Sequence, residues 1–552
     1  MEFTLKQISS LEKVRATDKP NHDEISKKCV LAGERFSYQI CIHAERIAFF
    51  TAAVESELAE YVKLYRVRDA VMDAPVTMDV PMEDYITQEP GLMPDILVPL
   101  EETANQVVAI KDQNSVIWVK VDIPKDTKPG TYSLRVNFTI QRHGNEFVGQ
   151  CHTDMEIEVI PAVMPEQKLI YTRWIYADCI ATAHNVEIYS EKHWELIDKY
   201  IAAAADVGIN MILVPTHTPP LDTEVGTTRP CVQLVDIEKK GDTFTFSFTK
   251  FKRYIDICQK HNIKYFEMAH MFSQWGAKYA ANILVTENGK TDYMFGWHVA
   301  ADSEEYRAFL KQYVKAISEE LVREGISETT YFHISDEPYI NNLDSYKAAS
   351  EIIRPLIGKS KTFDALSVYE IYEKGLVECP VTGIAHIHEF LEHEIENQWT
   401  YYCGTPQEVF TNSIMAMPSC RTRILGFLLY KYNIKGFLHW GLNFYNSCVS
   451  LYPINPYMTT SCDRSYPSGD GFILYPAADG VYSSIRGEVI FDAIQDMNVC
   501  FALEHLIGRE QVVKMIDEAA GRNLRFDDYP SDKNFLENLR AGMTQRIAEA
   551  GK

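Results

Sequence analysis

Apolar and polar residues alternate through much of the first 165 residues of the chain. The alternation is clear at 132–140, and it resumes at 155–159 after a polar turn at 143–145. A period of two is typical of half-buried β-strands, and a short turn between two such runs predicts an antiparallel hairpin. Similar runs lie at 36–42 and 116–123. We therefore expect an antiparallel β-sandwich with a supporting role over residues 1–165.

Beyond residue 165 the pattern changes to strands that alternate with helices. Apolar residues recur at helical spacing from the N-cap residue Ser190 to Gly208, and again from Ser303 to Gly325. A hairpin is predicted inside the insertion 232–248. The strand-like runs lie at 169–176, 209–214, 264–268, 330–335, 362–366, 381–386, 399–402 and 436–440. Eight strands that alternate with helices predict a (β/α)8 barrel of the TIM type.

The chain is expected to fold as three contiguous parts. These are a β-sandwich at 1–165, a (β/α)8 catalytic barrel at 166–508 and a short helical tail at 509–552. In the tail, apolar residues recur at helical spacing at Phe535, Leu539, Met543 and Ile547. Such spacing predicts an amphipathic helix, which we expect to pack back onto the barrel.

Composition narrows the classes of partner. The 552 residues carry a formal net charge of −23, which disfavours nucleic acid and anionic membrane surfaces because no basic patch is present to meet them. The 12 cysteines show no CxxC spacing, so we expect reduced thiols and no disulfide framework or zinc site. No run approaches the ~18 apolar residues of a membrane span, and no apolar leader is visible. A cytoplasmic location, no cofactor and no metal are therefore expected, while the oligomeric state stays open.

The stretch TYFHISDEP, residues 330–338, carries the main chemical signal. Its strand-like run ends in two adjacent carboxylates, Asp336 and Glu337, and Pro338 then pushes Glu337 toward an extended or turn geometry. In a barrel of parallel strands, the carboxyl ends carry the active site. Repulsion between the two acids favours one protonated group near neutral pH, as a general acid requires. The alternative interpretation is a helix N-cap or a loop ion pair.

Aromatic and polar residues gather at the predicted strand ends. A sugar fits such a lining, because its C–H faces stack on indole or phenol rings while its hydroxyls need planar polar partners. Each residue taken alone is more typical of core or rim; the number at strand ends favours substrate binding. The candidates are Trp174, Tyr176, His217, His270, Trp275, Tyr401, Tyr402, Trp440, Asn443, Tyr445 and Asp470.

The end of the seventh strand bears on the mechanism. It carries Tyr401, Tyr402 and Cys403, and no acid that could act as a nucleophile. This favours substrate-assisted catalysis, in which the 2-acetamido oxygen of the sugar attacks its own anomeric carbon. Asp336 would orient the acetamido N–H and stabilise its developing charge, and Glu337 would act as general acid and base. Tyr401 or Tyr402 could hold the acetamido oxygen.

Three other hypotheses stay open on the residues alone. A conventional glycosidase for a non-acetamido sugar would pair Glu337 with a second acid such as Glu389; Glu267 and Asp364 are ambiguous, since they could be paired inside the barrel. The HxH pair His386 and His388 could bind a metal with His217 and His270, but it falls on the sixth strand, whereas amidohydrolase barrels carry it on the first. A catalytically inactive, carbohydrate-binding barrel is the third hypothesis.

Three blocks carry a resemblance to a known family. HISDEP at 333–338, FLHWGLNFYN at 437–446, and PSGDGFILYP at 467–476 followed by SIR at 484–486 resemble glycoside hydrolase family 123. The similarity covers most of residues 165–505, with a β-sandwich expected before it.

The resemblance implies an exo-acting β-N-acetylgalactosaminidase that retains configuration through an oxazoline intermediate. It implies a glycan substrate with terminal N-acetylgalactosamine, and it maps the stabiliser onto Asp336 and the acid/base onto Glu337. The preference for N-acetylgalactosamine over N-acetylglucosamine, the group on the leaving side and the tolerance of sulfated sugars stay open.

Overall fold

The computed structural model describes residues 3–19, 22–142, 146–274, 276–339, 341 and 343–550, apart from the side chain of Asp84. The chain forms two compact units. The first comprises Met1–Lys168, Gln407–Lys431 and Tyr482–Lys552, and the second comprises Leu169–Pro406 and Tyr432–Val481. Both units are discontinuous in sequence, whereas the three predicted parts are contiguous. The predicted domain boundaries stay a prediction.

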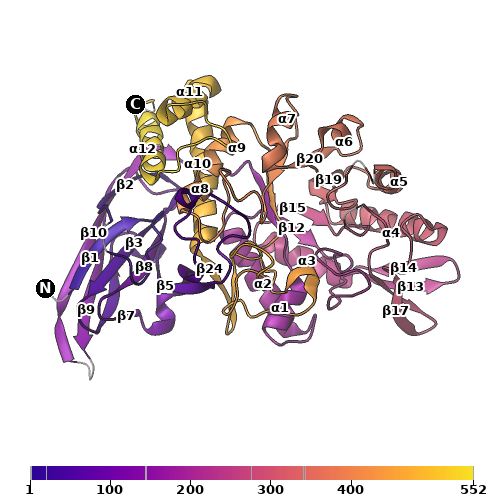
Figure 1. The fold of residues 1–552 in the computed structure, drawn as a ribbon, viewed down its shortest axis with the longest axis horizontal. Coiled ribbons are helices and arrows are strands. Elements are labelled where there is room, and N and C mark those ends of the chain that lie inside the picture. Colours follow the sequence, from indigo (N-terminus) through magenta and orange to yellow (C-terminus); the bar gives the residue numbers. More distant parts are fainter. Residues whose placement is uncertain are drawn as a thin grey trace. The chain divides into compact units, whose positions relative to one another are not determined.

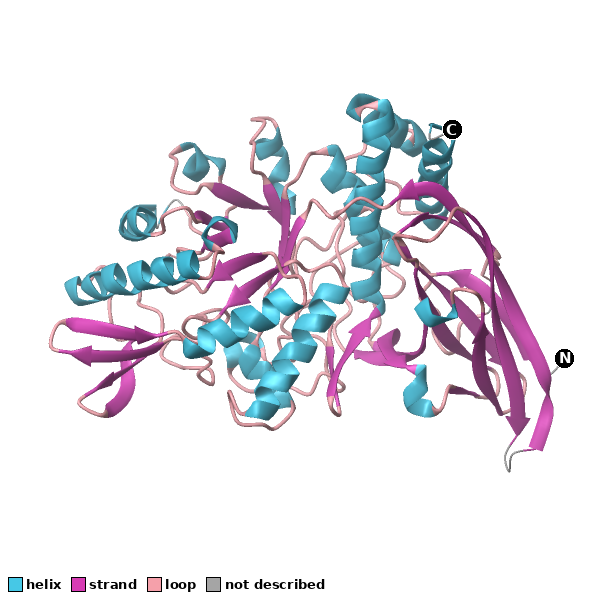
Figure 2. Cartoon of the chain, turned by 180° about the vertical axis from the view of Figure 1, so that it is seen from behind, coloured by secondary structure: helices cyan, strands magenta, loops and turns pink. Residues whose placement is uncertain are grey.

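The first unit contains two sheets made mostly of antiparallel strands (Figure 2). One includes, in this order, the strands β1 (Phe3–Ser9), β3 (Arg35–Ala44), β8 (Gln113–Asp122), β5 (Val62–Met72), β6 (Gly91–Pro99) and β24 (Gly480–Ser484). The other has the order β2 (Lys27–Ala32), β10 (Glu146–Val163), β9 (Gly130–Arg142), β4 (Ala48–Glu55) and β7 (Gln106–Ala109). The predicted antiparallel, sheet-rich N-terminal region is thus confirmed.

A single hydrophobic core joins the two sheets of this unit. It contains Ile40 and Val119 from one sheet and Phe138 and Ile157 from the other, all buried. Along β9 every second residue from Leu134 is buried, which is the alternation that the sequence shows. The predicted hairpin is β9 paired with β10; its turn residues 143–145 lie outside the described residues.

Helices complete the first unit. They are α8 (Ser419–Arg423), α9 (Leu425–Lys431), α10 (Ile485–Ile507), α11 (Arg509–Ala520) and α12 (Lys533–Ala550). The sequence predicts that the last amphipathic helix packs on the barrel. In the structure α12 buries Leu539, Met543 and Ile547, and within its own unit it contacts α10, α11 and the strands β2 and β10 (Figure 1).

The second unit is built around a closed barrel of eight parallel strands. In order these are β11 (Ile170–Arg173), β12 (Met211–Val214), β15 (Tyr265–Met268), β18 (Thr330–Phe332), β19 (Lys361–Ala365), β20 (Cys379–Gly383), β21 (Trp399–Tyr401) and β22 (Gly436–His439). The first and last strands pair in parallel, with Tyr171 opposite Phe437. Each predicted strand run overlaps one of these strands, so the barrel prediction is confirmed.

Helices of the second unit follow the barrel strands along the chain. They are α1 (Ala177–Ala183), α2 (Glu191–Asp206), α3 (Thr249–Lys260), α4 (Glu304–Arg323), α5 (Leu343–Ile353), α6 (Tyr369–Glu373) and α7 (Ile387–Leu391). The two predicted caps are present. The hydroxyl of Ser190 accepts the N–H of His193, and that of Ser303 accepts the N–H of Tyr306.

An accessory sheet is inserted into the barrel. Its order is β14 (Thr243–Ser247), β13 (Asp236–Lys240), β16 (Ile283–Glu287) and β17 (Lys290–Phe295). Figure 1 shows these strands next to α4, where Phe244 packs edge-on against Phe309 of α4 with ring centroids 4.9 Å apart. The β13–β14 hairpin confirms the prediction at 232–248; the sequence did not predict β16 and β17. Among the described residues, no helix is long and apolar enough to cross a membrane.

Candidate active site

Asp336 and Glu337 lie just past the carboxyl end of β18, the fourth barrel strand. Glu337 has a φ of 46°, in the left-handed region that residues other than glycine seldom adopt. The predicted turn geometry is therefore present in a strained form. Such a conformation costs on the order of 1–3 kcal/mol and is common at functional sites. It turns the chain sharply between the two carboxylates, so that each meets its own set of neighbours.

Asp336 is buried and held by an amide. Its Oδ2 accepts a hydrogen bond of 2.9 Å from Nε2 of Gln274, whose Oε1 in turn accepts the backbone N–H of Asp222 at 2.6 Å. Burial and then the charge of Glu337 raise the pKa of Asp336 to about 7, although the Gln274 bond opposes the shift. The raised pKa therefore falls on the first acid of the pair, and both protonation states of Asp336 are populated near neutral pH.

Glu337 is half-buried and has a phenolic partner. The hydroxyl of Tyr401, at the end of the seventh strand, donates a hydrogen bond of 2.7 Å to Oε1 of Glu337. Removal from solvent and then the charge of Glu337 raise the pKa of Tyr401 well above its usual value, so this hydroxyl stays a proton donor. The two acids are thus held by different donors, an amide at Asp336 and a phenol at Glu337.

A third acid, Asp470, lies close to the eighth strand. Its Oδ2 accepts the indole N–H of Trp440 at 2.9 Å, and its Oδ1 lies 3.3 Å from Nε2 of His439. Removal from solvent and the charge of Asp470, followed by that of Glu337, raise the pKa of the Cys403 thiol to about 12. Asp470 and Glu337 therefore both lie within electrostatic reach of Cys403.

A buried charged network surrounds His333, three residues before Asp336. Nε2 of His333 lies 2.9 Å from Oε2 of Glu267, and Nδ1 of His333 lies 3.0 Å from Oδ1 of Asp364. Trp174 donates its indole N–H to the same Oε2 of Glu267 at 3.1 Å, and Tyr346 donates its hydroxyl to Oδ2 of Asp364 at 2.5 Å. Burial lowers the pKa of His333, but the bonds to Asp364 and Glu267 outweigh it and raise this pKa to about 9.

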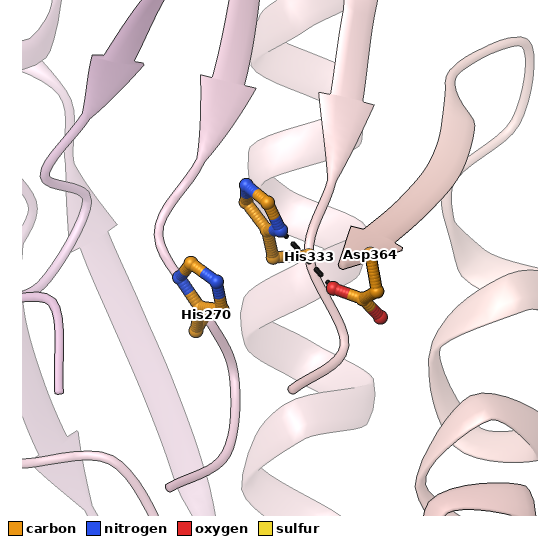
Figure 3. A group of neighbouring side chains, drawn as sticks. All are labelled: His270, His333 and Asp364. Atoms are coloured by element: carbon orange, nitrogen blue, oxygen red, sulfur yellow. Dashed lines mark hydrogen bonds and ion pairs between the residues drawn. The ribbon is translucent and has the colours of Figure 1, made fainter. Parts of the chain in front are cut away.

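His270 packs against this network. Its ring lies beside His333 (Figure 3), stacked with centroids 3.8 Å apart. Its carbonyl accepts a hydrogen bond of 2.9 Å from Nε2 of His217. Burial, followed by the charges of His333 and His217, lowers the pKa of His270 well below its usual value, so the ring is neutral. Both of its ring nitrogens are buried without a hydrogen-bond partner among the described residues.

The remaining sequence candidates have different surroundings. Trp440 belongs to the site, since it binds Asp470 and packs on Tyr466 with centroids 5.1 Å apart. Asn443 bonds the backbone of Tyr176 on both sides, at 2.9 and 3.0 Å, and thereby ties the loops after β11 and β22 together. The hydroxyl of Tyr445 donates to the carbonyl of Leu474, and the ring of Tyr402 packs on Phe437 and His439. Trp275 lies outside the described residues.

The arrangements that the alternative hypotheses require are not found for two sets of described residues. His386 and Glu389 are exposed beside α7, whereas His217 and His270 are fully buried, so the HxH pair does not gather with them. The carboxyl groups of Glu267 and Asp364 are fully engaged in hydrogen bonds inside the barrel. These two acids are therefore partners of His333, as the interpretation of interior pairing predicts.

Three contributors were not predicted from sequence. Gln274 lies six residues past the predicted strand 264–268 and directly precedes the candidate Trp275, but a lone glutamine carries no chemical signature. His439 lies inside the block FLHWGLNFYN, so the resemblance could have marked it. His333 likewise stands at the start of HISDEP, and only the fold reveals that Glu267 and Asp364 flank it.

The chain is similar to known proteins in sequence and in fold. Residues 174–503 match the family described as "Glycoside hydrolase 123, catalytic domain". Among solved structures, a family 123 glycoside hydrolase from Clostridium perfringens, studied for glycolipid glycan hydrolysis, is 15% identical with a TM-score of 0.74, over 100% of this chain and 97% of that one. A Bifidobacterium dentium β-glucuronidase is 7% identical with a TM-score of 0.32, over 90% and 67%. A search of curated proteins finds no match.

Proposed function

The chain belongs to glycoside hydrolase family 123, and from this premise we propose that it releases terminal β-linked N-acetylgalactosamine with retention of configuration. The observation that carries the proposal is the Asp336–Glu337 pair past the fourth barrel strand, with each acid held by a different donor. Adjacent acids in separate environments are suited to separate tasks in one reaction.

Glu337 is proposed as the general acid and base. As the acetamido oxygen of the sugar bonds to the anomeric carbon, the bond to the leaving oxygen breaks and that oxygen takes the proton of Glu337. Water then adds to the anomeric carbon of the oxazolinium ring, gives its proton to Glu337 and reopens the ring. Two displacements at the same carbon retain its configuration. Tyr401 keeps Glu337 oriented through both steps.

Asp336 is proposed as the stabiliser of the acetamido group. During attack the amide nitrogen gains positive charge, and an ionised carboxylate facing its N–H lowers the energy of that state. The pKa of Asp336 rises to about 7 chiefly because its site excludes solvent, so the anion is poorly solvated before the reaction. The developing positive charge then supplies the partner that Asp336 lacks. Binding energy is thereby concentrated on the transition state.

Matched substitutions test these roles. Glu337→Gln should lower kcat on a nitrophenyl β-N-acetylgalactosaminide by about 10²–10⁴-fold, and much less on a dinitrophenyl glycoside whose leaving group needs no proton. Asp336→Asn should impair both substrates alike, because the oxazolinium forms in both cases. The exposed acid of α7 serves as the control, since Glu389→Gln should behave as wild type. Equal activity of wild type and both site variants would defeat the proposal, as would an inert wild type.

A second candidate function rests on Asp470. This acid is buried beside Trp440 and could serve as a nucleophile opposite Glu337 in a two-carboxylate glycosidase for a non-acetamido sugar. A thiazoline that mimics the oxazoline should inhibit only the substrate-assisted enzyme. Failure of the thiazoline to inhibit, together with a covalent glycosyl adduct on Asp470, would favour the second function.

A further inference from the structure

The backbone that leads into Asp336 is fixed at several points. Oδ2 of Asp364 accepts the N–H groups of Ile334 and Ser335, at 3.2 and 3.5 Å, while Oδ1 of the same carboxylate binds His333. The hydroxyl of Ser335 donates to the carbonyl of Ser273 at 2.9 Å. One carboxylate on β19 therefore binds the side chain of the first residue and the backbone of the next two in the segment 333–335.

The imidazole of His333 faces an acceptor on each side. Glu267 approaches one ring nitrogen and Asp364 the other, and both acids are fully buried. Burial raises the pKa of Asp364, while its bonds to His333, Tyr346 and the backbone N–H of Ile334 oppose that shift. With both acids ionised, two carboxylate acceptors need two N–H donors, so His333 carries both protons and a positive charge. The indole N–H of Trp174 and the hydroxyl of Tyr346 satisfy further oxygens of the two acids. A buried charge that is paired and hydrogen-bonded on both sides is the arrangement in which such a charge is tolerated.

A metal ion is the competing occupant of this place. Donor atoms of His270, His333 and Asp364 lie within 4.8 Å of one another (Figure 3). A metal needs a lone pair on each histidine, whereas both nitrogens of His333 are spent on N–H bonds to carboxylates. The His270 and His333 rings are also stacked, with planes 14° apart. The cation that this geometry favours is the imidazolium itself.

We propose that Glu267, His333 and Asp364 form a positioning triad, in which a charged His333 links β15 to β19 and holds the segment 333–335 so that Asp336 and Glu337 keep their working orientation. The triad acts on Asp336 and Glu337 through the backbone of residues 333–335, which precedes both acids. This inference rests on the proposed function only for its kinetic readout.

The triad also contributes to the electrostatics at Asp336, after burial, the charge of Glu337 and the Gln274 hydrogen bond. The positive charge of His333 lowers the pKa of Asp336, and the negative charge of Asp364 raises it. The titratable groups that face His333 are Glu267 from β15, Asp364 from β19 and the neutral ring of His270. Because His333 lies between Glu267 and Asp364, its positive charge offsets buried negative charge near the Asp336–Glu337 pair.

Paired substitutions test the triad by kinetics. His333→Gln replaces the imidazolium by a neutral amide, which can donate to Asp364 but turns its oxygen toward the Glu267 carboxylate. The segment 333–335 should therefore shift, and kcat on the aryl glycoside should fall by about 10²-fold with little change in KM. Adding Glu267→Gln restores a matched chain of donors and acceptors and should recover at least a tenfold part of that loss. Failure of the double variant to exceed the single one would overturn the proposal.

The buried histidine of α2 supplies the control. His193 is fully buried, and its Nε2 lies 2.9 Å from the carbonyl of Ala177, away from the catalytic pair. His193→Gln should lower Tm while leaving kcat unchanged. A loss of kcat in this variant as large as that of His333→Gln would show that any buried histidine has the same effect, and would defeat the positioning role.

A second measurement needs no activity. Nitrogen NMR of histidine-labelled protein should show both ring nitrogens of His333 protonated at pH 7, with the signal assigned through the His333→Gln variant. An unprotonated nitrogen there, or one equivalent of bound metal that disappears in His270→Ala, would overturn the triad. If the NMR result holds while wild type cleaves no β-N-acetylgalactosaminide, the proposed function fails and the charged triad stands.

Discussion

At Asp336 burial and a neighbouring negative charge act in the same direction. Both favour the neutral acid, and the single hydrogen bond from Gln274 only partly opposes them. The proposed chemistry needs the anion of Asp336. With a pKa of about 7, part of Asp336 is protonated near neutral pH, and the positive charge that develops on the bound substrate favours its ionised form. The same acid in water would be ionised at neutral pH but would stabilise a developing charge far less, because solvent would screen it.

The pH dependence of catalysis follows from this residue. In the proposed mechanism the ionised form of Asp336 is the active one. Because burial and the charge of Glu337 raise its pKa to about 7, kcat/KM should fall as the pH drops through about 7. Asp336→Asn cannot ionise, so its residual kcat/KM should lack this limb. The check is a kcat/KM profile of both proteins between pH 5 and 9 at constant ionic strength. A limb with the same midpoint in the Asn variant would assign it to another group.

At the scale of elements, close contacts between helices rest on small residues. In α9 a Cβ added at Gly426 would come 1.9 Å from the carbonyl oxygen of Ala493 in α10. In α12 a Cβ at Gly542 would meet only the terminal methyl of Met515, at 3.3 Å. The first contact is with rigid backbone and the second with the flexible end of a side chain. Glycine is therefore required in α9 by packing, and in α12 it is not.

Two glycine substitutions separate packing from helix propensity. Gly426→Ala should lower the free energy of unfolding by several kcal/mol, about 3 or more, because α9 and α10 would have to move apart. Gly542→Ala should change it by less than about 1 kcal/mol and toward greater stability, since alanine favours the helix. Chemical denaturation of the two variants measures both. Similar losses in both would contradict the backbone contact at Gly426.

Element patterns were more readable from sequence than the contacts they create. The eight barrel strands and the caps Ser190 and Ser303 were predictable, because apolar periodicity and N-cap chemistry are local. The position of Asp336 and Glu337 was predictable because the two acids follow a strand-like run and precede a proline, although β18 itself already ends at Phe332. Gln274, bonded to Asp336 across 62 positions, was not, and neither was the placement of His333 between Glu267 and Asp364. Such pairings depend on which strands become neighbours, and periodicity does not encode that.

For the molecule as a whole, the charged triad links stability to pH. The folded pKa of His333, about 9, lies above its ordinary value of 6.5. The stabilisation from this group is therefore fully present below pH 6.5 and is lost as the pH rises through about 9. The difference in unfolding free energy between wild type and His333→Gln should shrink by up to about 3 kcal/mol across that window. Denaturation at a series of pH values measures it, and a difference that grows with pH would contradict the charged state.

The first unit combines segments from both ends of the chain, which has a consequence for folding during synthesis. Lys120 is buried against Glu488 at 3.2 Å, and Glu34 is buried against Arg540 at 2.7 Å. The N-terminal member of each pair leaves the ribosome several hundred residues before its partner, and an unpaired buried charge is strongly destabilising. These two ion pairs can therefore form only after the C-terminal helices α10 and α12 have been translated. A chain truncated before those helices would leave Lys120 and Glu34 without these partners.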